Sequence, residues 1–160
     1  ADEAVATLRR AVADLEAAGE RARAGLVMSS LATALGYAGQ RREALRMHRE
    51  AMRVHEELGA RRMVGVDGLS VAVHFALEGD LVEAEHWFTT CQDAFRDAED
   101  LFAEQICQSN LAHLNLELGR WDASEASAAR ALDLDRKLGF TDGQVGLAAR
   151  EQARCDAAAA

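Results

Sequence analysis

The chain has 160 residues, of which 49% are hydrophobic and 28% charged, a composition that excludes a disordered tail. Its net charge of −9 at pH 7 argues against direct nucleic-acid binding, which needs a basic surface. No apolar run approaches the ~20 residues that a membrane span requires, so no membrane contact is expected.

Glycines recur in two series with a period of forty residues, so that one falls about every twenty residues. The two series are Gly39, Gly79 and Gly119, and Gly19, Gly59 and Gly139. Glu99 stands where the second series would have a further glycine. Glycine just after a helix adopts the left-handed conformation without steric cost, so each glycine marks a helix end. Because the chain has no proline, the pattern predicts long helices joined by tight turns.

The helices are expected in a simple order along one domain, 1–160. An unpaired helix at 2–18 precedes three helical hairpins at 21–58, 61–98 and 101–138, and a capping helix follows at 141–156. The unpaired first helix favours a fragment of a larger protein. The last helix is more polar, with Glu151 and Gln152 at positions where apolar residues would repeat. A polar last helix suits the solvated end of a repeat array.

Small residues repeat with the same period where the two helices of each hairpin would cross. The repeated pairs are Leu31-Ala32, Val71-Ala72 and Leu111-Ala112 on first helices, and Glu43-Ala44 and Glu83-Ala84 on second helices, with Ser124 taking the alanine place in the third copy. Antiparallel helices approach to 8–10 Å only where side chains at the crossing are small. Larger apolar residues such as Phe88 and Phe95 are expected to fill the flanking groove.

The third copy, from Asn110 to Gly139, resembles the tetratricopeptide repeat (TPR) consensus. Its long, forty-residue form is similar to the repeats of kinesin light chains and of bacterial peptide-sensing regulators. The resemblance covers nearly the whole chain and implies an all-α, right-handed α-α superhelix of antiparallel helix pairs. The aromatic residue usual after the mid-repeat glycine survives only as Trp121, being Arg41 and Leu81 elsewhere.

The concave side of such a superhelix is lined by the first helix of each hairpin, and we expect it to bind a protein or extended peptide. In the resembled family, a polar residue before the Leu-Ala pair contacts peptide backbone. The matching positions here are Ser30, Ser70 and Asn110, and the positions one and two turns further on are Thr33, Val73, His113, Tyr37, Leu77 and Glu117. An alternative is that Ser30 and Ser70 only cap local carbonyls or tolerate close packing. The family's two-carboxylate clamp is not matched, which disfavours a C-terminal carboxylate ligand.

The sequence offers no pattern for catalysis, a cofactor or a metal, so we expect a non-enzymatic protein. His48 and His55 lie seven residues apart, too far for zinc ligands on one helix, and a structural or surface role is expected for both. Gly65 and Gly68 fall inside a predicted helix, where they would allow close helix contact.

Three cysteines, Cys91, Cys107 and Cys155, lack any CxxC spacing. They indicate reduced, mostly buried thiols in a cytoplasmic protein. Two other hypotheses accompany the scaffold. One is a regulatory or sensor segment of a larger bacterial signalling or transcription protein that changes superhelical pitch on ligand binding. The other is a homodimer formed through the unpaired N-terminal helix.

Overall fold

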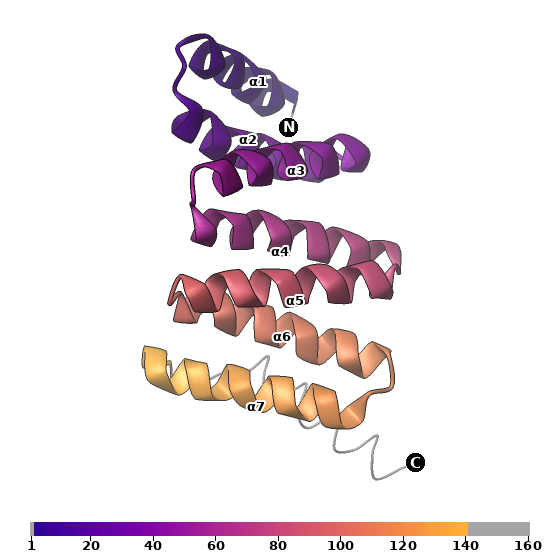
Figure 1. Cartoon of the computed structure of the whole chain (residues 1–160). Helices are drawn as coiled ribbons and strands as arrows, with labels where there is room; N and C mark the ends of the chain where they lie inside the picture. Colours follow the sequence, from indigo (N-terminus) through magenta and orange to yellow (C-terminus); the bar gives the residue numbers. More distant parts are fainter. Residues whose placement is uncertain (1, 141–160) are drawn as a thin grey trace.

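The computed structural model describes residues 2–140, which form seven α-helices and no strand. The helices are α1 (Asp2–Ala17), α2 (Arg21–Tyr37), α3 (Arg41–Glu57), α4 (Arg61–Glu78), α5 (Leu81–Asp97), α6 (Leu101–Glu117) and α7 (Trp121–Leu138). Figure 1 shows them stacked in chain order, from α1 at one end to α7 at the other. The expected capping helix at 141–156 lies outside the described residues.

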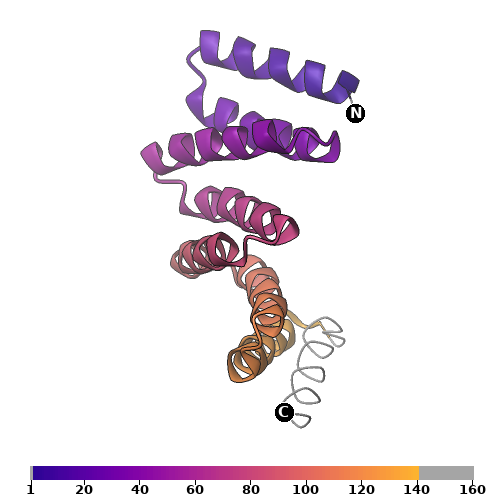
Figure 2. The ribbon, with the colours of Figure 1, turned by 90° about the vertical axis from the view of Figure 1, so that its right-hand side faces the viewer.

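Each helix packs on the helices before and after it in the chain, so that α2 and α3, α4 and α5, and α6 and α7 form antiparallel hairpins. The first helices α4 and α6 also touch each other. In Figure 2, α1 to α3 are seen from the side, whereas α6 and α7 are seen nearly along their axes. The helix direction therefore turns along the stack, and the fold is the TPR-like, all-α solenoid of helix pairs that the sequence predicts. None of the helices in residues 2–140 combines the length and apolarity needed to cross a bilayer.

The helices end where the two glycine series predict. All six glycines have positive φ, between 68° and 80°, and Glu99 adopts the same conformation, with φ of 53°. In every turn, the N–H of the residue after this position donates to the carbonyl five residues earlier, at 2.8–3.0 Å. This bond satisfies a carbonyl that the helix end would otherwise leave unpaired. Glu99 therefore occupies a turn that is built for glycine.

Replacing Glu99 with glycine should raise the free energy of unfolding by about 1 kcal/mol, because a side chain with a Cβ is strained in the left-handed region. Urea denaturation measures the change. The reverse substitution Gly59→Ala, one repeat earlier, should lower the free energy of unfolding by a similar amount, since no atom lies within 4 Å of its added Cβ and only the backbone is strained. Equal stability of the Glu99→Gly variant and the wild type would contradict this account of the turns.

The repeated small residues are buried where the helices of each hairpin meet. Ala32, Ala44, Ala72 and Ala84 are all 0% exposed. In the third hairpin, the Ser124 hydroxyl donates to the carbonyl oxygen of Ala112 at 2.8 Å. A serine is accommodated here because the opposite backbone accepts its proton, as a buried hydroxyl requires.

Two helix-interior glycines receive rings from the neighbouring helix of the same hairpin. A Cβ on Gly65 would lie 2.7 Å from Phe95, and a Cβ on Gly25 would lie 2.8 Å from His55 Nε2. Gly68 lies against Cys91, where a Cβ would be 3.4 Å from Cys91 Cβ. Close helix contact is therefore the role of these glycines, as predicted for Gly65 and Gly68.

Gly25→Ala should destabilise the protein, because the new methyl group would displace the His55 ring and overpacking costs about 1–3 kcal/mol. The matched control is Gly36→Ala in the same helix, where the nearest atom is His74 Cε1 at 3.7 Å. That control should stabilise the protein by up to about 1 kcal/mol through helix propensity. Thermal and urea unfolding of both variants check the opposite signs, and a stabilising Gly25→Ala change would show that the ring can move freely.

The hydrophobic core is divided between α3 and α4. One cluster of buried apolar residues is formed by α1, α2 and α3, and the other main cluster by α4, α5 and α6. Neither cluster crosses the interface between the first two hairpins. Neither cluster therefore contains residues from both α3 and α4.

Candidate functional site

Three buried polar side chains fill the interface between α3 and α4. His48 and His55 of α3 each place Nδ1 against one carboxylate oxygen of Asp67 on α4, at 3.1 Å and 2.9 Å. Asp67 is 0% exposed, and its partners within residues 2–140 are these two imidazoles. We call this group the polar seam. An ionised Asp67 accepts from Nδ1–H of both rings, which leaves Nε2 of each ring as an acceptor.

The two rings of the polar seam differ in their surroundings. His55 Nε2 is buried without a hydrogen-bond partner, beside Gly25 of α2. His48 and Asp67 line a surface cavity, which His55 does not. Both histidines are buried. Of the two roles expected from the sequence, structural or surface, the structure therefore shows the structural one.

The forty-residue period contained the signal for the polar seam. His48 and His55 occupy the positions of Phe88 and Phe95 in the next hairpin, and Asp67 occupies that of Cys107. Phe88, Phe95 and Cys107 are buried in the apolar interface between α5 and α6. Aligning the repeats would therefore have placed both histidines in the core, facing Asp67.

Exchanging the polar seam for its apolar counterpart should preserve the fold. We expect Asp67→Ala to cost about 2–4 kcal/mol, because it leaves two buried N–H donors unpaired. The triple variant His48→Phe, His55→Phe and Asp67→Cys reproduces the next interface and should lie within about 1.5 kcal/mol of the wild type. Urea denaturation compares the two, and a triple variant less stable than Asp67→Ala would show that the two interfaces are not equivalent.

A cavity of about 300 Å³ opens beside the polar seam, between the first helices α2 and α4. It is lined by Leu26, Ser29, Ser30, Thr33, His48, Met63, Val66, Asp67 and Ser70. We call the nine binding residues predicted on the first helices the ladder. The structure brings three of them, Ser30, Thr33 and Ser70, together around one space. We call it the seam cavity.

Every hydroxyl group around the seam cavity donates to its own helix. Ser29, Ser30 and Thr33 bond to carbonyl oxygens four residues earlier at 3.1–3.2 Å. Ser70 does the same to Val66 at 3.2 Å. The local carbonyl bonding that was the alternative for Ser30 and Ser70 is therefore present. Because each proton is engaged, each hydroxyl presents its oxygen lone pairs to the cavity.

A second cavity of about 250 Å³ lies on α6 and includes two further ladder residues, Asn110 and His113. Its other described lining residues are Gln105, Ile106 and Ser109. Asn110 donates from Nδ2 to the carbonyl of Ile106 at 2.8 Å. This bond orients the amide and leaves its oxygen as an acceptor for the N–H of a peptide.

The remaining predicted residues lie apart from these cavities. Tyr37, Leu77 and Glu117 are exposed at the C-terminal ends of α2, α4 and α6, Tyr37 at 89%. Val73 packs against the apolar cluster of α4 to α6 and is half-buried. The ladder is therefore polar and accessible near its middle, whereas its far end offers isolated exposed side chains.

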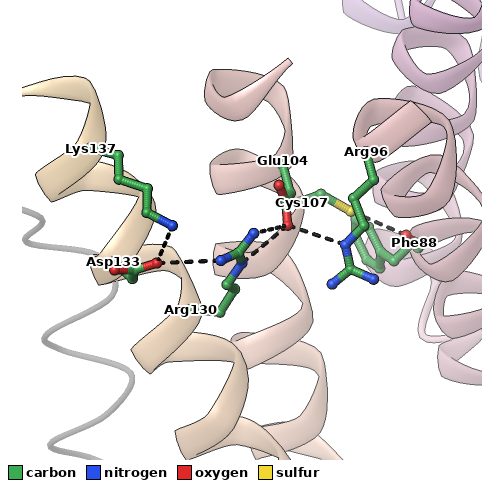
Figure 3. A network of polar contacts seen from close by, with 7 residues as sticks. All are labelled: Phe88, Arg96, Glu104, Cys107, Arg130, Asp133 and Lys137. Carbon is green, nitrogen blue, oxygen red and sulfur yellow. Dashed lines mark hydrogen bonds and ion pairs between the residues drawn. The ribbon is translucent and has the colours of Figure 1, made fainter. Parts of the chain in front are cut away.

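A buried carboxylate also ties the last two hairpins together. Figure 3 shows Glu104 of α6 between Arg96 of α5, at 3.2 Å, and Arg130 of α7, at 3.0 Å. Arg130 continues to Asp133, which also contacts Lys137. Glu104 is 2% exposed and its charge is matched by two guanidinium groups. Such pairing fixes the packing of three helices, which is the role the geometry supports.

The two cysteines among the described residues, Cys91 and Cys107, are buried free thiols. Cys91 and Cys107 place their sulfur atoms 3.2 Å apart, and Cys107 donates to the carbonyl of Phe88 at 3.1 Å. The hydrogen bond with Cys91, together with burial, raises the pKa of Cys107 far above its usual range, so the reactive thiolate form is suppressed. Cys155 lies outside the described residues. Within 2–140, no group of three or more His, Cys, Asp or Glu side chains is placed to hold a metal ion.

Comparison with known proteins supports the fold. No protein-family model matches the chain, and no curated protein matches it by sequence. Among solved structures, the chain is similar to BtubC (BKLC) from P. vanneervenii, a kinesin light chain-like TPR protein, with a TM-score of 0.66 and 16% sequence identity. The match covers 82% of this chain and 59% of that chain. At this identity the likeness shows a TPR-like helical-repeat fold.

Proposed function

We propose that this protein is a non-catalytic scaffold of the long-repeat TPR type that binds an extended peptide or protein segment on its concave side. The observation that carries the proposal is the seam cavity, which lies between first helices of successive hairpins. Three residues selected by their repeat position, Ser30, Thr33 and Ser70, line it together. An extended peptide laid across α2, α4 and α6 would meet this cavity and the one around Asn110 in turn.

The residues that line the two cavities are better suited to binding a peptide than to catalysing a reaction. Their hydroxyl groups are acceptors for backbone N–H groups, and Asn110 supplies a further amide oxygen on α6. The buried ionisable groups nearby are held by structural partners, as in the polar seam and around Glu104. This arrangement provides recognition at several points and no activated nucleophile.

A bulky residue on the concave side should block binding. A random dodecapeptide phage library is selected on the immobilised protein, and the recovered peptides are synthesised with a fluorescent label. Fluorescence polarisation then gives their affinities for the wild type and for Thr33→Trp, which places an indole ring in the seam cavity. We expect Thr33→Trp to weaken binding by about tenfold or more.

The matched control is Thr90→Trp on α5. Thr90 is also exposed, and its hydroxyl also bonds to the carbonyl four residues earlier, at 2.9 Å, but it belongs to a second helix. Affinity should be unchanged in this variant. Peptides that bind Thr33→Trp as tightly as the wild type would overturn the concave-side proposal.

A further inference from the structure

The seam cavity offers hydrogen-bond acceptors and no side-chain donor. The four hydroxyl protons are engaged by their own helices. His48 also lines the cavity, and in the neutral tautomer that donates from Nδ1 to Asp67 its Nε2 is an acceptor. A ligand group that fills this space therefore has to supply several donors of its own.

Among the residues that the structure describes, the seam cavity is lined by one carboxylate, Asp67, and by no lysine or arginine. Asp67 lines the cavity and forms ion pairs with neither residue type in the described part of the chain. In α2 and α4, arginine occurs only at the N-terminal end, within the first three residues of α2 and the first two of α4, and neither helix contains lysine. The first helix of the third hairpin, α6, contains no lysine or arginine. By contrast, Glu104, the other buried carboxylate of a first helix, is matched by two arginines. Asp67 is hydrogen-bonded by two imidazoles but has no arginine or lysine beside it within residues 2–140, and this difference favours a cationic ligand in the cavity.

The apolar part of the lining fits the stem of a long basic side chain. Leu26, Met63 and Val66 provide the apolar walls, and the acceptors are His48, the hydroxyl groups and the carboxylate behind them. Lysine carries an aliphatic stem that ends in three donors, and arginine carries one that ends in five. A neutral apolar side chain would leave the acceptors unpaired, and an acidic side chain would be repelled.

We infer that the seam cavity is a subsite for a basic side chain, lysine or arginine, of a peptide bound on the concave side. This inference rests on the proposed function and specifies its ligand chemistry. The cationic group bonds to His48 Nε2 and to the serine and threonine oxygens, and Asp67 supplies the opposite charge. The polar seam thus both joins the first two hairpins and selects the ligand.

The test uses peptides from the phage selection, synthesised with lysine, arginine or norleucine at each basic position. Norleucine keeps an aliphatic stem of similar length and removes the charge and the donors. We expect norleucine at one position to weaken binding to the wild type by about tenfold or more, as expected for lost hydrogen bonds to a charged group. Comparison of the lysine and arginine peptides shows which of the two basic groups the cavity prefers.

Two variants identify the cavity as the origin of this preference. Asp67→Asn keeps the side-chain shape and removes the charge, and Ser30→Ala/Ser70→Ala removes two acceptors without altering the polar seam. In both variants, the ratio between the affinities of the basic peptide and the norleucine peptide should fall by at least about threefold. Asp135→Asn, which alters a buried carboxyl group on α7, should leave this ratio of affinities unchanged. Because the serine variant does not depend on the seam, it decides the outcome even if Asp67→Asn fails to fold.

The two proposals fail in different ways. If Thr33→Trp blocks peptide binding, but the norleucine peptides bind the wild type as tightly as the basic peptides do, the basic subsite is overturned. The scaffold function is then still supported. A preference for basic residues that persists in both cavity variants also overturns the subsite, since it then reflects the overall charge of −9. Peptides that Thr33→Trp does not affect overturn both proposals.

Discussion

The whole architecture depends on how closely two helices can approach at one crossing. Where Ala32 and Ala44 are fully buried, no side chain larger than a methyl group separates the backbones of α2 and α3. Small residues recur at this crossing every forty residues, so the three hairpins are built in the same way and stack in chain order. The position of the seam cavity between first helices of successive hairpins is a result of this repetition.

The interface between hairpins is less constrained than the crossing within them. It is apolar between α5 and α6, where Phe88 and Phe95 are buried, and polar between α3 and α4, where His48 and His55 take the same places. The polar solution satisfies its carboxylate with two imidazole donors. The repeat therefore tolerates chemical change at this position, and a ligand-binding feature can arise there without altering the fold.

Periodicity made the fold predictable, because glycine at each turn and alanine at each crossing are direct consequences of backbone geometry. It also predicted that Ser30, Thr33 and Ser70 would share one face, and they line one cavity. The polar seam was missed because His48 and Asp67 are nineteen residues apart and belong to different hairpins, so neither local spacing nor a known motif connects them. Val73 was placed on the binding face, but its half-buried packing depends on how closely neighbouring helices cover it, which the period alone does not determine.

The division of the apolar core has a mechanical consequence. Two blocks that each retain their own apolar cluster meet at the α3–α4 junction, where a change in their relative tilt would have to alter the buried hydrogen bonds of Asp67. A molecule seated at that junction touches both blocks, so its binding energy would favour one tilt over the others. Binding of a molecule at the middle of the array would then change the orientation of its two ends relative to each other.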